Sequence, residues 1–157
     1  MKVRPVPVVL FALIACVAVS TPALAVTTVS RSGTTVTITG GDEANFLDQL
    51  TSGSLDPLRY RDADGLNFGA GCVDVGDFTI ECGQVDPGLV VNVSLGGGNG
   101  TFRPVDSFSS STVIVADLGP GDDTMNGSAL NDAITGGPGA DSINGRRGAG
   151  HHRRRRG

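Results

Sequence analysis

Residues 118–144, LGPGDDTMN-GSALNDAIT-GGPGADSIN, decide the fold, because they form three consecutive nonapeptides. Each nonapeptide has an aspartate as its sixth residue and an aliphatic side chain as its eighth. The aspartates are Asp123, Asp132 and Asp141, and the aliphatic residues are Met125, Ile134 and Ile143. A fixed period of this kind predicts that the chain stacks one small structural unit on the next.

Each unit is expected to be a glycine-rich turn followed by a very short strand. Glycine permits the positive φ angles and the close main-chain approach that such turns need. The aliphatic residue should point inward and stack on its counterparts in neighbouring coils. The aspartate should supply a carboxylate beside exposed carbonyl oxygens. Calcium takes about six to eight oxygen ligands in a flexible arrangement, so turns of this composition are suited to bind it.

The nonapeptides can be compared with the template G-G-x-G-x-D-x-U-x, in which U is a large aliphatic residue. The third matches throughout, the first lacks only its opening glycine, and the second has Ser128 and Leu130 in place of two glycines. The run resembles the RTX, or haemolysin-type, calcium-binding repeats. The resemblance extends weakly to residues 95–102, where Gly100 takes the aspartate position. It implies an all-β fold of short stacked strands, with a β-solenoid, or parallel β-roll, at the C-terminal end.

In the β-roll of that family, successive turns alternate between two sides, so each calcium ion lies between one repeat and the next but one. The resemblance therefore implies a site formed by Asp123 and Asp141, together with the Asp122 side chain. Its carbonyl oxygens would come from Gly119, Gly121, Gly137 and Gly139. Asp132 belongs to the other side, where its partner position holds Gly150, so a half-site is expected there. The alternative is that these Gly-Asp turns bind nothing.

Residues 1–25 have the pattern of a secretory signal peptide. A basic start precedes an apolar core at 8–19, and Ala-Leu-Ala at 23–25 offers a cleavage site, so the mature chain should begin at Val26. The apolar core is short for a membrane span, and no second apolar stretch predicts one. Classical RTX toxins lack an N-terminal signal, so the chain departs from them here. Secretion is expected, and a lipid anchor on Cys16 is the alternative.

Residues 26–117 are expected to form a β-rich domain whose role the sequence does not indicate. Alternating or β-branched runs predict short strands. These strands are expected at 35–39, 78–82, 89–95 and 112–116. The one helix expected is a short one at Glu43–Leu50, with Phe46, Leu47 and Leu50 on one face. Many stacked strands suit a chain with 24 glycines and 4% aromatic residues better than a thick core does.

Cys72 and Cys82 remain after removal of the signal peptide, and nine residues lie between them. In an exported chain this pattern predicts a disulfide. Metal ligation by the two thiols is the alternative. It is disfavoured because no histidine or further cysteine lies nearby to complete a site.

The charges are distributed unevenly along the chain. All 16 acidic residues lie between Asp42 and Asp141, whereas residues 26–144 contain only four arginines, giving a net charge of 4 − 16 = −12. Such a segment is either a soluble exported surface or a binder of cations. The repeats favour the second reading.

The C-terminal tail, residues 146–157, is basic instead. Its composition is typical of a patch for polyanions or nucleic acid, or of a histidine-rich metal tract. We favour neither. One set of GC-rich codons for residues 151–157, read one base later, encodes Thr-Ile-Asp-Gly-Gly-Ala-Gly, which places an aliphatic residue in phase at His152. The tail is therefore interpreted as further repeats read out of frame, and a genuine basic tail is the alternative.

No catalytic function is expected. The only histidines, His151 and His152, lie in the tail, so Ser-His-Asp and Cys-His schemes lack a base.

The sequence predicts a secreted calcium-ion-binding protein with a structural or surface-associated role, whose repeats become ordered when calcium binds. One alternative is an adhesin or carbohydrate-binding module with a cell-surface or glycan partner. Another is a truncated remnant of a larger RTX toxin or hydrolase.

Overall fold

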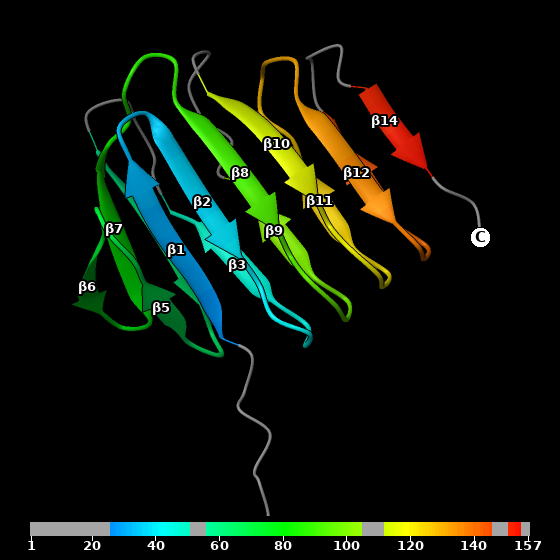
Figure 1. Ribbon diagram of the computed structural model, residues 1–157, viewed down its shortest axis with the longest axis horizontal. Helices are drawn as coiled ribbons and strands as arrows, with labels where there is room; N and C mark the ends of the chain where they lie inside the picture. The colour runs from blue at the N-terminus through cyan, green and yellow to red at the C-terminus, as the bar shows by residue number, and fades with distance from the viewer. Residues whose placement is uncertain (1–25, 51–55, 105–111, 146–150, 155–157) are drawn as a thin grey trace, which may run out of the picture.

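The structure, a computed structural model, describes residues 26–50, 56–104, 112–145 and 151–154. In these ranges the protein is all-β, as expected, and its strands form two seven-stranded sheets that lie as two layers (Figure 1). Sheet A has the strand order β14-β12-β10-β8-β2-β1-β5, and sheet B has the order β13-β11-β9-β3-β4-β7-β6. The expected signal peptide, with Cys16, and residues 146–150 and 155–157 of the tail lie outside the described residues.

The strand positions agree with the sequence pattern in most places. Sheet A contains β1 (Thr27–Ser32), β2 (Thr35–Thr39), β5 (Leu66–Phe68), β8 (Val90–Ser94), β10 (Val113–Asp117), β12 (Ala133–Gly137) and β14 (His151–Arg154). Sheet B contains β3 (Phe46–Gln49), β4 (Pro57–Asp62), β6 (Val73–Gly76), β7 (Thr79–Gln84), β9 (Thr101–Arg103), β11 (Thr124–Asn126) and β13 (Ser142–Asn144). The strands predicted at 35–39, 78–82, 89–95 and 112–116 correspond to β2, β7, β8 and β10.

The helix predicted at Glu43–Leu50 is wrong, because residues 46–49 form β3. This strand pairs in parallel with β9 and antiparallel with β4, so the sheet satisfies main-chain groups that an isolated short helix would satisfy poorly. Leu47 is buried, whereas Phe46 is 47% exposed and Leu50 is 37% exposed. The three apolar residues therefore do not share a face. No helix in the described part of the chain is long and apolar enough to cross a membrane.

From β8 onward, successive strands alternate between the two sheets. In sheet A, β8, β10, β12 and β14 continue in parallel from β2. In sheet B, β9, β11 and β13 continue in parallel from β3. The antiparallel pairs all belong to the N-terminal part, where they join β1 to β2, β3 to β4, and β7 to both β4 and β6. The N-terminal part and the repeats thus build the same two sheets.

The core lies between the sheets and follows their registers. The aligned core positions are Leu47, Phe102, Met125 and Ile143 in sheet B, and Ile38, Val93, Ala116 and Ile134 in sheet A. The aliphatic residues of the repeats point inward, as predicted: Met125 and Ile134 are buried, and Ile143 is partly buried. Burying a side chain of this size stabilises the fold by about 1.5–3 kcal/mol, so these columns supply much of the cohesion between coils.

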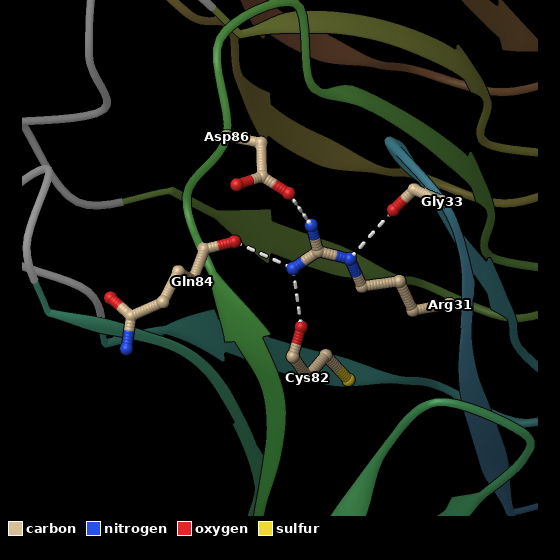
Figure 2. A network of polar contacts seen from close by, with 5 residues as sticks. All are labelled: Arg31, Gly33, Cys82, Gln84 and Asp86. Carbon is tan, nitrogen blue, oxygen red and sulfur yellow. Dashed lines mark hydrogen bonds and ion pairs between the residues drawn. The ribbon is translucent and has the colours of Figure 1, made fainter.

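Two linkages fasten the N-terminal end of the sheets. The predicted disulfide between Cys72 and Cys82 is present and joins the residue before β6 to β7. Arg31 on β1 donates from Nη1 to the carbonyl oxygens of Cys82 at 2.6 Å and Gln84 at 2.5 Å, and Nη2 forms an ion pair with Asp86 (Figure 2). The guanidinium therefore ties sheet A to sheet B.

Candidate metal centre

Glycine-rich turns stack along the edge where β2, β8, β10 and β12 of sheet A continue into strands of sheet B, beyond the arrowheads of β8, β10 and β12 in Figure 1. Three of them are residues 95–100, 118–123 and 136–141. A Cβ on Gly121 would overlap the carbonyl oxygen of Gly98, and one on Gly139 would overlap that of Gly121. Glycine at these positions therefore lets the main chains touch. Residues 95–100, in the segment where a weak repeat is expected, form one turn of this stack.

A fourth turn, at residues 40–45, begins the stack and was missed by the sequence analysis. Gly97 donates its main-chain N–H to the carbonyl oxygen of Gly41 at 2.9 Å. Asn45 aligns with Gly100, the aspartate position, and its Nδ2 donates to the carbonyl oxygen of Leu95 at 2.7 Å. The Gly-Gly opening and the inward Leu47 keep the repeat spacing, but asparagine in place of aspartate hides the match.

The repeat aspartates hold neighbouring coils together through their carboxylates. Oδ1 of Asp123 accepts the N–H of Gly100 at 2.7 Å, and Oδ1 of Asp141 accepts the N–H of Asp123 at 3.1 Å. Oδ1 of Asp132 accepts the N–H of Ile114 at 2.9 Å. In each case the donor is the residue aligned with the aspartate in the preceding coil. An aspartate at the sixth position is therefore a structural link between coils as well as a source of charge.

A second, exposed set of bonds runs beside the first. Oδ1 of Asn99 accepts the N–H of Asp122 at 2.9 Å, and Oδ1 of Asp122 accepts the N–H of Ala140 at 2.7 Å. The fifth residue of one turn thus binds the fifth residue of the next. Asn99 and Asp122 are both exposed, so water competes for these bonds and each contributes less than a buried one.

Asp123 is the least satisfied acid of this edge. The residue is 1% exposed, and its Oδ2 has no hydrogen-bond partner. Burial raises the pKa of Asp123; the Gly100 N–H opposes the increase, and the charges of Asp141 and Asp122 add to it. An ionised oxygen buried without a donor or a cation is costly. The surroundings of Asp123 therefore disfavour its ionised form.

Asp132, on the opposite edge, has hydrogen bonds to both of its carboxylate oxygens. Oδ2 of Asp132 accepts the Ser128 N–H at 2.6 Å, and its Oδ1 accepts the Ser128 hydroxyl at 2.7 Å in addition to the Ile114 N–H. Asp132 is 3% exposed, so these bonds are shielded from water. The structure thus separates Asp132 from Asp122, Asp123 and Asp141, as the expected alternation of turns requires. Gly150, the expected partner position, lies outside the described residues.

The four glycines predicted as carbonyl ligands lie in the two turns that contain Asp123 and Asp141. Gly119 contacts Gly137, and Gly121 contacts Gly139. Within the described ranges, no group of three or more His, Cys, Asp or Glu side chains is placed to hold a metal ion. A site here would therefore combine carboxylates with main-chain carbonyl oxygens, a mixture that calcium accepts.

Comparisons of the chain with protein-family models, with curated proteins and with solved structures find no match. The stacked turns and their charges therefore supply the evidence on function.

Proposed function

We propose that the protein is an exported calcium-binding protein of the RTX type, in which one calcium ion joins turn 118–123 to turn 136–141. The observation that carries the proposal is the buried, unpartnered Oδ2 of Asp123. Asp122 and Asp141 add negative charge beside it. A divalent cation would give this oxygen a partner and offset the repulsion among the three carboxylates.

The oxygen inventory of the two turns agrees with calcium. Asp123 and Asp141 each contribute a carboxylate, and the predicted carbonyl oxygens belong to Gly119, Gly121, Gly137 and Gly139. Together they would provide about six ligands, the lower end of the range that calcium takes. The Oδ1 atoms already accept main-chain hydrogen bonds, but a carboxylate has about four lone-pair sites and can bind a cation as well. The Asp122 side chain would complete the set.

The strand alternation supports a parallel β-roll for the C-terminal part. Strands β8 to β13 pass from one sheet to the other at every step and pair in parallel with the strand two places away. In such an arrangement an ion between adjacent turns fastens one complete coil to the next. Calcium at a hundredfold excess over its Kd would stabilise the folded chain by about 2.7 kcal/mol. The proposed role is accordingly structural, at the cell surface or outside the cell.

Export is proposed from two features that agree. The first is the signal-peptide pattern of residues 1–25. The second is the Cys72–Cys82 disulfide, since disulfides persist in oxidising compartments. Calcium at such locations is abundant enough for a weak site to be occupied.

Calorimetric titration of the purified protein with calcium tests the proposal. We expect one saturable heat, which the double variant Asp123→Asn, Asp141→Asn abolishes. Asparagine keeps the Oδ1 acceptor, so this variant removes charge while preserving the hydrogen bonds. Asp117→Asn, on the exposed end of β10, is the matched control and should leave the heat unchanged. The absence of heat at millimolar calcium, or equal heat in the double variant, would contradict the proposal.

The register of β14 bears on the tail. Strand β14 pairs in parallel with β12, and Ile134 aligns with His152, the position at which the repeat phase requires an aliphatic residue. This register supports the hypothesis that the tail is a further repeat read out of frame. The nucleotide sequence after the Gly145 codon tests it: codons that encode no repeat in either other frame would end the hypothesis.

A further inference from the structure

The sequence contains three Asn-Gly pairs, at 99–100, 126–127 and 144–145. In such a pair the glycine nitrogen can attack the carbonyl carbon of the asparagine side chain, because glycine has no Cβ to hinder the approach. The attack forms a succinimide ring and leads to deamidation. The structure distinguishes the first pair from the second by the hydrogen bonds of the attacking nitrogen.

The attacking nitrogen of the first pair has a base beside it. Gly100 donates its N–H to Oδ1 of Asp123 at 2.7 Å, which is within the reach required for proton transfer to a carboxylate. Gly127, in the second pair, instead donates its N–H to the main-chain carbonyl oxygen of Asn144 at 2.7 Å. An amide carbonyl is a far weaker base than a carboxylate, so the two nitrogens differ in reactivity.

The attacked carbonyl group of the first pair is also polarised. Oδ1 of Asn99 accepts the N–H of Asp122 at 2.9 Å. Negative charge develops on this oxygen during the attack, and a positioned N–H donor stabilises it there. Asn99 is exposed, so water can reach the ring once it has formed. Turn 118–123 thus supplies both the base and the donor.

We propose that turn 118–123 promotes the conversion of Asn99 to an acidic residue. The Gly100 nitrogen forms a bond to Cγ of Asn99 while the carboxylate of Asp123 takes its proton. The C–N bond to the side-chain nitrogen then breaks, and that nitrogen leaves as ammonia after receiving the proton. One water molecule opens the succinimide at either carbonyl carbon, which gives aspartate or isoaspartate. The net change is the gain of one water and the loss of one ammonia.

The aspartate product would alter the stack of turns. A carboxylate at position 99 still accepts the Asp122 N–H, so the exposed bond is kept. It also gives turn 95–100 its only acidic side chain, because the aspartate position of that turn is Gly100. The use of this carboxylate as a calcium ligand rests on the proposed function, whereas the modification itself does not.

Peptide mass spectrometry after timed incubation of the purified protein in a calcium chelator tests the proposal. Deamidation of Asn99 is followed in the folded protein and in guanidinium-denatured protein at the same pH, with Asn126 as the internal comparison. Since a positioned base contributes roughly 10²-fold or more, we expect Asn99 to react at least about tenfold faster when the protein is folded. It should also react faster than Asn126 in the folded protein.

Two variants locate the cause. Asp123→Asn removes the base and should slow the Asn99 reaction at least about tenfold. Asp117→Asn changes an exposed acid at the end of β10 that is neither the base nor the donor, and it should leave the rate unchanged. Should Asp123→Asn fail to fold, the comparison of folded and denatured wild-type protein still decides. A folded-state rate for Asn99 no higher than its denatured-state rate would overturn the proposal, whatever the calcium titration gives.

Discussion

Replacing Asp132 by alanine removes the acceptor of three hydrogen bonds at the edge opposite the candidate metal centre. Two of the donors are the main-chain N–H groups of Ile114 and Ser128, and the third is the Ser128 hydroxyl. Ile114 is fully buried and Ser128 is 1% exposed, so neither N–H can donate a hydrogen bond to water instead. The hydroxyl can rotate to another acceptor, but the main-chain groups cannot.

The expected loss follows from the two stranded N–H groups. A buried donor left without an acceptor costs about 1–3 kcal/mol, so two of them give about 2–6 kcal/mol. Part of this loss in stability is offset, because the variant has no carboxylate to desolvate on folding. We therefore expect Asp132→Ala to lower the free energy of unfolding by about 2–4 kcal/mol. Domains of this kind have about 5–15 kcal/mol in total.

Urea unfolding followed by circular dichroism, in the presence of a chelator, measures this loss. With a slope of about 2 kcal/mol per molar urea, the midpoint should fall by roughly 1–2 M. Asp122→Ala is the matched control: its side chain is exposed and binds one N–H, that of Ala140, so its removal should cost less than about 1 kcal/mol. If Asp132→Ala cost no more than Asp122→Ala, the account of the sixth-position aspartates as structural links would be refuted.

Three further variants probe other parts of the fold. Arg31→Lys leaves a single nitrogen in place of the guanidinium that binds Cys82, Gln84 and Asp86. The variant should lower the thermal midpoint by several degrees in a melting experiment. Gly139→Ala places a Cβ on the carbonyl oxygen of Gly121 at a φ of 143° and should destabilise the protein by at least about 2 kcal/mol, as read by urea unfolding; an unchanged midpoint would argue against the contact. Burial raises the pKa of Asp62, so the folded state binds the proton of this carboxyl group more tightly than the unfolded state does. The contribution of Asp62 to stability is therefore lost as the pH rises from the ordinary carboxyl pKa through the raised one. Asp62→Asn lacks that loss, so its stability relative to wild type should improve as the pH rises above the ordinary carboxyl pKa of about 3.9. Parallel pH profiles of the two proteins would contradict the assignment.

The parts of the fold that could be predicted are those that depend on local sequence patterns. The alternation at 35–39 gives β2 at the same residues, and the nonapeptide period places Met125 and Ile134 inside the core. Cys72 and Cys82 pair as expected, because the two cysteines that follow the expected signal peptide have one intramolecular choice. These features depend on residues that are close in sequence, so the local pattern predicts them.

The features that were missed depend on which coil lies beside which. Residues 43–50 carry apolar side chains at a helical spacing, and only the pairing of β3 with β4 and β9 selects the strand. Asn45 reads as an ordinary turn residue until β3 aligns with β9 and puts it at an aspartate position. Ser128 looks like a defect in the template, yet it supplies two of the donors to Asp132. Such roles follow from the register between coils and not from the local sequence.

The central claim is that a calcium ion lies between the turns that contain Asp123 and Asp141. The most direct measurement is a crystal structure of the protein grown with calcium, with anomalous scattering used to locate the ion. The account predicts one ion between these turns, with carboxylate and glycine carbonyl oxygens at about 2.3–2.6 Å. An ion bound elsewhere, or solvent alone between Asp123 and Asp141, would contradict it.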